Sequence, residues 1–171
     1  MKVDPALPSI LPRLIEALRH ELHQYGEMLA LLDRQQEAVM IRAGDEVLQS
    51  VTAISDHLAH VAAARGEREA CQQLIAEALQ QSRDKDFTEL LPLLPGKFQP
   101  AVEALVRENN ELLIRVQQRA RQNHLLLSRS VELMQRFLHA LIPASQPTIY
   151  NGAGSVEAAP PQTQPLYEAV G

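Results

Sequence analysis

The fold is decided by the stretch from Gln99 to Ile142, which reads QPAVEALVRENNELLIRVQQRARQNHLLLSRSVELMQRFLHALI. After Pro100 this stretch contains no proline, the residue that interrupts helices. One set of its residues recurs in alternating steps of four and three, the spacing of one face of a coiled-coil helix. This seam consists of Val102, Val106, Asn109, Leu113, Val116, Ala120, Asn123, Leu127, Ser130, Met134, Phe137 and Leu141. The pattern predicts one long helix over about 99–142.

Two polar residues, Asn109 and Asn123, occupy seam positions that are normally apolar. A buried asparagine at such a position lowers stability but fixes the register between neighbouring helices. We therefore expect this helix to pack along a partner helix. The asparagines could fix the register of an intramolecular bundle or of a homodimer, and the spacing alone leaves both open.

Two further helices are predicted before this one, over about 9–42 and 45–81, and Pro12 falls in a first turn that tolerates proline. Apolar residues share one face in each predicted helix. These are Leu11, Leu14, Leu18, Tyr25, Leu29 and Leu32 in the first, and Val47, Val51, Ile54, Leu58 and Val61 in the second. We expect Gly44 to end the first helix, Asp45 to cap the second, and Asp86 to cap a single turn over 87–91.

These elements predict an all-α fold. Residues 1–142 are expected to form an elongated antiparallel three-helix bundle, or coiled coil, with a long third helix. Residues 143–171 are rich in Pro, Ala, Gln and Gly, which predicts a flexible C-terminal tail. Within the tail, residues 147–154 read PTIYNGAG and combine an aromatic with a β-branched residue. We interpret 147–154 as a docking segment.

Composition narrows the classes of function. The chain has 171 residues, a net charge of -5 and 4% aromatic residues. The acidic balance argues against a nucleic-acid binder, which needs a basic surface. The arginines of the third helix are read as a solvated face that pairs with acids of the first two helices. The single cysteine, Cys71, suits a reducing compartment. No apolar run is long enough to span a membrane, and we expect no signal peptide, because no uninterrupted apolar run follows Lys2. We predict a cytoplasmic protein.

Two HxxH pairs, His20 with His23 and His57 with His60, are the residues best placed to hold a metal ion, because i and i+3 share a helix face. Glu16 lies one turn before His20 and Glu27 one turn after His23, but a zinc site needs three or four converging ligands and neither pair identifies the others. We therefore predict solvated histidines and no metal or other cofactor. Glu67 and Glu69 lie near Cys71, which disfavours a reactive thiolate. No catalytic constellation emerges, and the chain is not predicted to be an enzyme.

The C-terminal half of the third helix is apolar around more of its circumference than one partner helix requires. This pattern is interpreted as a surface for an amphipathic helix of another protein, with plain core packing as the alternative. The candidate binding residues are Leu126, Leu127, Leu133, Met134, Phe137, Leu138 and Leu141.

Several motifs resemble the FlgN family of flagellar export chaperones. They are the runs RENNELL at 107–113 and RQN at 121–123, then Pro143 and the segment PTIYNG at 147–152. The family shows a Pro-Thr-(aliphatic)-Tyr-Gly signature after its long helix, and here Asn151 stands between the tyrosine and the glycine. The resemblance extends from about Leu14 to Gly154 and is strongest after Arg107.

The resemblance implies a cytoplasmic chaperone for the hook–filament junction proteins FlgK and FlgL. It would bind their C-terminal helical segments and deliver them to the type III export gate. By motif position, Tyr150 with Ile149 would dock on the export-gate protein FlhA. Two alternatives stay open: a structural coiled coil that self-associates through the third helix, and a helical metal-binding protein that uses the HxxH pairs.

Overall fold

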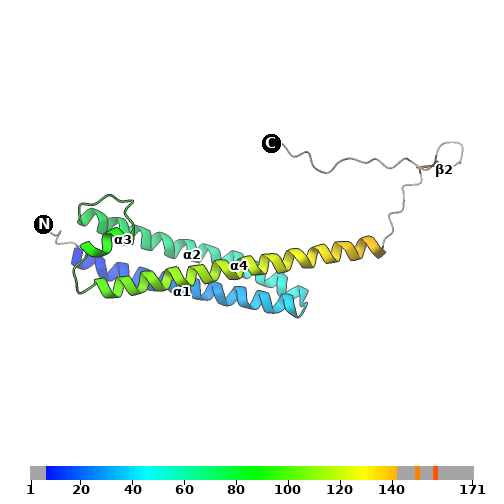
Figure 1. Ribbon diagram of the computed structural model, residues 1–171, viewed down its shortest axis with the longest axis horizontal. Helices are drawn as coiled ribbons and strands as arrows, with labels where there is room; N and C mark the ends of the chain where they lie inside the picture. Colours follow the sequence, from blue (N-terminus) through cyan, green and yellow to red (C-terminus); the bar gives the residue numbers. More distant parts are fainter. Residues whose placement is uncertain (1–6, 142–148, 151–155, 158–171) are drawn as a thin grey trace. The chain divides into compact units, whose positions relative to one another are not determined.

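The computed structural model describes residues 7–141, 149–150 and 156–157. These residues form long helices packed together, as predicted, and a pair of two-residue strands (Figure 1). In chain order the elements are α1 (Leu7–Met40), α2 (Gly44–Ala78), α3 (Phe87–Leu90), the 3-10 turn η1 (Leu91–Leu93), α4 (Gln99–Leu141), β1 (Ile149–Tyr150) and β2 (Val156–Glu157). The chain divides into two compact units, Met1–Leu127 and Ser128–Gly171.

In the first unit, α1 and α2 run side by side in opposite directions (Figure 1). The turn between them closes through the backbone. Arg42 takes the left-handed conformation with φ 58°. Its N–H donates to the carbonyl of Val39 at 3.2 Å, and the next N–H, of Ala43, donates to the carbonyl of Ala38 at 2.9 Å. This pair of bonds is a Schellman motif, which satisfies the last carbonyls of a helix.

The expected roles of Gly44 and Asp45 are therefore wrong. Gly44 is the first residue of α2, and no side chain caps this helix. Asp45 lies within the first turn, where its negative charge favours the positive end of the helix dipole. Because the Schellman bonds already fix the chain at Arg42, neither a glycine terminator nor an aspartate cap is needed.

The other end of α2 closes in the same way. Gln80 has φ 57°, and the N–H of Gln81 donates to the carbonyl of Ala76 at 2.8 Å. After this turn, the side chain of Asp86 accepts the N–H of Glu89 at 3.1 Å and caps α3. This cap confirms the single turn predicted there.

The core of the first unit gathers at the end that contains α3 and η1. Leucines of α1 recur every three or four residues and are buried there against the end of α2, the α3–η1 segment and the start of α4. The residues from α1 are Leu7, Leu11, Leu14 and Leu18, and those from the other elements are Cys71, Ile75, Leu79, Leu90, Leu94 and Val102. Each such leucine contributes roughly 1.5–3 kcal/mol on burial.

The first part of α4 packs on α1 through the two seam asparagines. The Nδ2 of Asn109 donates to the carbonyl of Leu18 at 3.0 Å, and that of Asn123 donates to the carbonyl of Leu32 at 2.7 Å. Both asparagines are buried, as the seam predicts. The two asparagines are two heptads apart in α4, and the carbonyls that they contact are two heptads apart in α1, in the same order along the chain. Helix α4 therefore runs parallel to α1 here. The asparagines therefore fix a register within one chain.

In the second unit, β1 pairs with β2 in antiparallel register, Ile149 opposite Glu157 and Tyr150 opposite Val156. The predicted flexibility of 143–171 and most of the docking segment 147–154 lie outside the described residues. Over the part of the chain that is described, no helix is long and apolar enough to cross a membrane.

Candidate functional site

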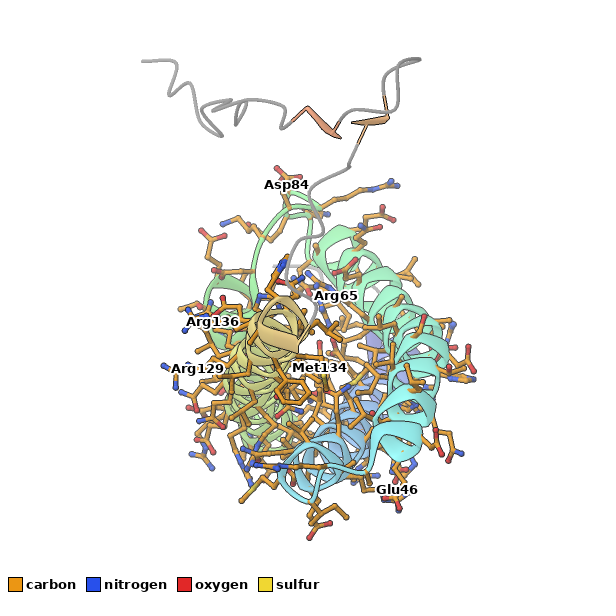
Figure 2. The ribbon with its side chains drawn as sticks, turned by 90° about the vertical axis from the view of Figure 1, so that its right-hand side faces the viewer. Glu46, Arg65, Asp84, Arg129, Met134 and Arg136 are labelled. Atoms are coloured by element: carbon orange, nitrogen blue, oxygen red, sulfur yellow. The ribbon has the colours of Figure 1, made fainter. Side chains whose placement is uncertain are left out.

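The end of α4 carries large apolar side chains that nothing in the described structure covers. Five residues in its last turns are between 48% and 64% exposed: Val131, Leu133, Met134, Phe137 and Leu138. Met134, Phe137 and Leu138 are spaced by three and four residues and share one face. Arg129 and Arg136 lie on the other side of the helix from Met134 (Figure 2). The end of α4 is therefore an amphipathic helix with an open apolar face.

This face contains most of the predicted binding residues. Leu133, Met134, Phe137 and Leu138 are exposed, whereas Leu126 and Leu127 are half-buried. The side chain of Leu141 lies outside the described residues. A cluster of exposed apolar side chains of this kind marks an interaction surface, because monomeric proteins rarely leave such clusters in water. Below, the name α4 face refers to Val131, Leu133, Met134, Phe137 and Leu138.

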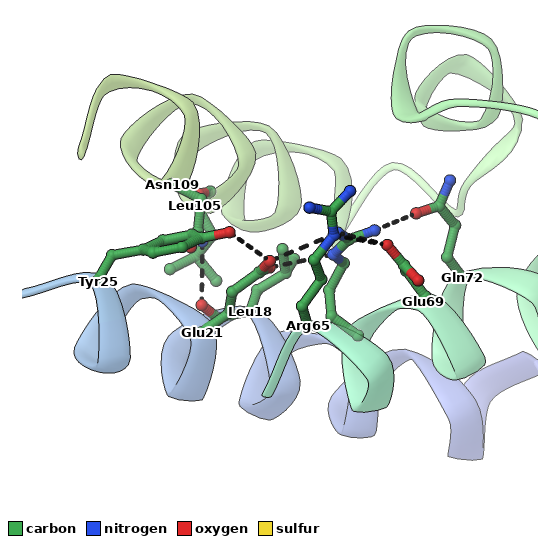
Figure 3. Close-up of polar contacts among 9 residues, drawn as sticks. Leu18, Glu21, Tyr25, Arg65, Glu69, Gln72, Leu105 and Asn109 are labelled. Carbon is green, nitrogen blue, oxygen red and sulfur yellow. Dashed lines mark hydrogen bonds and ion pairs between the residues drawn. The ribbon is translucent and has the colours of Figure 1, made fainter. Parts of the chain in front are cut away.

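A polar cluster that the sequence analysis missed joins α1 to α2 (Figure 3). Glu21 is 3% exposed. Its carboxylate accepts a hydrogen bond from the Nε of Arg68 at 3.0 Å and another from the hydroxyl of Tyr25 at 3.0 Å. Arg68 also donates to Gln72 at 2.9 Å. A buried carboxylate is tolerated only when it is paired and hydrogen-bonded, and this one is both.

The cluster fixes the hairpin and holds Tyr25 in its neutral form. Burial, followed by the charge and the hydrogen bond of Glu21, raises the pKa of Tyr25 to about 12. The tyrosine is therefore a hydrogen-bond donor at any physiological pH. The sequence does carry a signal for this cluster: Glu21 and Tyr25 continue the four-three spacing of Leu14 and Leu18, so a charged residue occupies a core position.

Neighbouring charges on the surface of α2 pair locally. Arg65 donates to Glu69 at 2.9 Å, one helical turn away. This hydrogen bond lowers the pKa of Glu69 and raises that of Arg65. Both side chains are well exposed, so the pair adds little to stability.

Histidines of both HxxH pairs link α1 and α2. The Nδ1 of His20 lies 3.1 Å from a carboxylate oxygen of Glu67. The Nε2 of His57 lies 2.9 Å from the carbonyl of Gln24, and its ring is tilted against that of His60, with centroids 5.6 Å apart. Over the residues that the structure describes, no three His, Cys, Asp or Glu side chains converge to hold a metal ion. His57 is therefore half-buried between the two helices, whereas the contact of His20 lies on the exposed surface of the hairpin.

The arginines of α4 are partly engaged as expected. Arg119 pairs with Asp33 of α1 at 3.0 Å and also contacts Gln36. Arg107 lies 3.9 Å from Glu111 on its own helix. Acids of the hairpin and of α4 itself thus neutralise part of the positive charge.

Comparison with known families gives a match over most of the chain. A family model described as FlgN protein matches residues 10–158. The chain belongs to the FlgN family. This membership makes it a flagellar export chaperone by family, and the family is one of chaperones rather than enzymes. Comparison with curated proteins and with solved structures gives no match.

The match contains both surfaces predicted for a FlgN-type chaperone. The α4 face and the pair Ile149 and Tyr150 fall within residues 10–158. The backbone of Ile149 and Tyr150 forms β1, while their side chains lie outside the described residues. For this FlgN-family chain, the α4 face is thus the predicted surface whose side chains the structure describes.

Proposed function

We propose that this FlgN-family protein is a cytoplasmic chaperone that binds the C-terminal helical segments of the hook–filament junction proteins FlgK and FlgL. The bound client is delivered to the flagellar type III export gate through contact with FlhA. The observation that carries this proposal is the exposed α4 face. Such a face is unfavourable in water and gains stability when an apolar partner covers it.

The chemistry of the α4 face suits a client helix. Apolar residues at i, i+3 and i+4 match the anchors of an amphipathic helix that lies along a partner helix. Met134 and the leucines adapt to different client side chains, which fits a chaperone with two clients. Fully burying one such side chain contributes roughly 1.5–3 kcal/mol, so four or five anchors can exceed the cost of association. The client face would be sealed from water and from other chains until export.

Client binding is tested with a C-terminal fragment of FlgK from the same organism, by size-exclusion chromatography with light scattering and by calorimetry. The full chain should form a complex of defined stoichiometry. Leu133→Asp or Phe137→Asp should abolish the complex, because each places a charge within the apolar contact. His139→Asp is the matched control, since it adds the same charge at an exposed position on the side of α4 away from this face.

Circular dichroism should show the same helix content for all three variants, because each substituted side chain is exposed. If Phe137→Asp binds the fragment as well as His139→Asp does, the client does not use this face.

Delivery to the gate is assigned to Ile149 and Tyr150. Tyr150→Ala should leave binding of the FlgK fragment unchanged, because the substitution lies outside the α4 face. The same variant should block secretion of FlgK and FlgL and weaken binding to the cytoplasmic domain of FlhA. Normal secretion by Tyr150→Ala cells would remove the docking role.

A further inference from the structure

A cavity within the first unit lies between α2 and the first part of α4. It has a volume of about 360 Å³, and side chains of α1, α2, α3 and α4 line it. Phe87 and Thr88 of α3 line it at the end where α3 and η1 close the core. The two long walls consist of Arg65, Arg68 and Gln72 from α2 and Val106, Asn109, Asn110 and Leu113 from α4.

Both walls continue beyond the cavity as one groove. Leu58 and Val51 lie seven and fourteen residues before Arg65, so they stand on the same side of α2. Gln117 lies seven residues after Asn110, on the same side of α4. Because α2 and α4 run in opposite directions, both series lead away from α3, toward the turn at Arg42. At 1.5 Å per residue, walls of about 20 residues extend roughly 30 Å, the length of a helix of about 20 residues.

Apolar side chains are open to water along this continuation. Leu58 and Val51 are 55% and 49% exposed. They belong to the apolar stripe of α2, whose other members are half-buried: Val47, Ile54 and Val61. Packing against α1 therefore covers one side of the stripe and leaves the groove side open. At the level of Leu58, α4 carries the exposed residues Gln117 and Ala120, and the small Ala120 leaves Leu58 uncovered. We call Val51, Leu58, Gln117 and Ala120 the α2–α4 groove.

Charges at the α3 end of the groove are already compensated. Arg68 pairs with Glu21 at 3.0 Å, and Arg65 pairs with Glu69 at 2.9 Å. Glu103 is exposed seven residues before Asn110 and would repel a further acid at this end. A partner is therefore expected to be polar but uncharged where it meets the cavity.

Farther along, toward the turn at Arg42, the charge of the groove is positive. Helix α4 contains no Asp or Glu between Leu112 and Leu127. Arg121 is exposed one turn after Gln117 on the groove side, and it has no ion pair among the described residues. The only acid of α2 between Val47 and Ala64 is Asp56, which lies on the side of α2 opposite Leu58. A partner for this half must combine apolar residues with an acidic flank.

We propose that the α2–α4 groove binds a second helical segment of the client, as an amphipathic helix laid between α2 and α4. Its apolar residues cover Leu58 and Val51, and its acidic residues lie beside Arg121. This inference rests on the proposed function, which supplies the client. It adds a binding site in the first unit that shares no residue with the α4 face.

Two substitutions in the groove test this site by calorimetry of the full chain with the C-terminal FlgK fragment. Leu58→Glu and Arg121→Glu should each weaken binding at least tenfold, because both add negative charge beside an acidic helix. Gln49→Glu, on the opposite side of α2, and Arg115→Glu, on the side of α4 away from the groove, are the matched controls and should bind like the wild type. All four positions are exposed, so circular dichroism should show unchanged helix content.

Photo-crosslinking locates the client without relying on affinity. A benzophenone amino acid in place of Gln117 should crosslink to the FlgK fragment, whereas the same amino acid in place of Arg115 should not. Crosslinks at position 117 that join two copies of the chain and exclude the fragment would make a second copy the occupant and overturn the proposal.

The binding results separate this inference from the proposed function. If the wild type does not bind the FlgK fragment at all, the proposed function fails and the inference fails with it. If Phe137→Asp abolishes binding while Leu58→Glu and Arg121→Glu bind as tightly as their controls, the client uses the α4 face alone. The proposed function would then stand, and the groove site would be wrong.

Discussion

The two halves of α2 have similar apolar spacing and different surroundings. In the C-terminal half, Cys71 and Ile75 are at most 6% exposed, whereas Val51 and Leu58 in the N-terminal half are 49% and 55% exposed. Around the C-terminal half of α2, α3, η1 and the start of α4 close over the hairpin. At the other end, packing against α1 covers only one side of the stripe. Periodicity shows which face of a helix is apolar, and only the tertiary arrangement decides whether water reaches it.

The largest expected effect tests directly whether the two halves of α2 differ in burial. Ile75→Ala should lower the free energy of unfolding by about 3 kcal/mol, because it leaves a cavity in a closed core. Leu58→Ala should cost less than about 1 kcal/mol, because its side chain is already half in water. Urea unfolding followed by circular dichroism measures both variants. Equal losses would mean that the N-terminal half of α2 is as well covered as the C-terminal half.

A somewhat smaller effect is expected where the buried half of α2 begins, at the Glu21–Arg68 pair. Glu21→Ala should cost about 2–3 kcal/mol, because it leaves the guanidinium of Arg68 beside the core with only its longer, 3.4 Å contact to the carboxylate of Glu69. That side chain is 16% exposed, so water can relieve part of the loss. The exposed pair of Glu67 and His20 is the control, and Glu67→Ala should cost less than about 1 kcal/mol.

Replacing both Glu21 and Arg68 shows whether the loss of stability comes from the unpaired charge. When Glu21 and Arg68 are both replaced by methionine, most of the lost stability should return, because no unpaired charge remains. If the double variant is as unstable as Glu21→Ala, the pair stabilises the hairpin through more than charge compensation.

The sequence predicted the parts of the fold that depend on local spacing. The long helices, the buried positions of Asn109 and Asn123 and the cap at Asp86 all follow from residue types a few positions apart. The Glu21–Arg68 pair could not be read in this way, because its partners come from different helices and their register is set by tertiary packing. The turn at Arg42 was missed for a related reason: its energy lies in backbone bonds that any residue can make, so the side chain gives no signal.

The candidate site shows the same limit. The spacing of Met134, Phe137 and Leu138 identified an apolar face on the last helix, but core packing would require the same spacing. Their exposure is what distinguishes an open surface from a core, and it depends on where other elements end. The exposure of Val51 and Leu58 on α2 was missed because both residues were assigned to an apolar stripe inside a bundle.

The pH dependence of stability tests the contact between Tyr25 and Glu21 without replacing either charged residue of the Glu21–Arg68 pair. The pKa of Tyr25 rises from 10.0 in the unfolded chain to about 12 in the folded protein, so the folded state favours the neutral hydroxyl. The resulting stabilisation is complete below pH 10 and is lost as the pH rises through 12. Its size is at most about 2.7 kcal/mol for a shift of two pKa units.

Chemical unfolding between pH 9 and 12 measures this loss. Tyr25→Phe should be less stable than the wild type at pH 9 and should show a weaker decline above pH 10, because its side chain cannot ionise. A wild-type profile identical to that of Tyr25→Phe would show that the Tyr25 hydroxyl does not feel Glu21.

The smallest effect concerns the two turns that end α1 and α2. Arg42, at the open end of the hairpin, and Gln80, at the closed end, both adopt the left-handed conformation, with φ near 58° and 57°. A residue with a Cβ pays about 1 kcal/mol or more for this conformation, and glycine does not. Arg42→Gly and Gln80→Gly should therefore each raise the free energy of unfolding by up to about 1 kcal/mol.

The gain should be similar at the two ends, because strain in φ belongs to the residue itself and does not depend on how well the helices around it are covered. Arg34→Gly, in the interior of α1, is the control and should lower stability by about 1 kcal/mol. If only Gln80→Gly stabilises the protein, the turn at Arg42 is not held in the left-handed conformation in solution. The open end of the hairpin would then differ from the closed end in its backbone as well as in its side-chain burial.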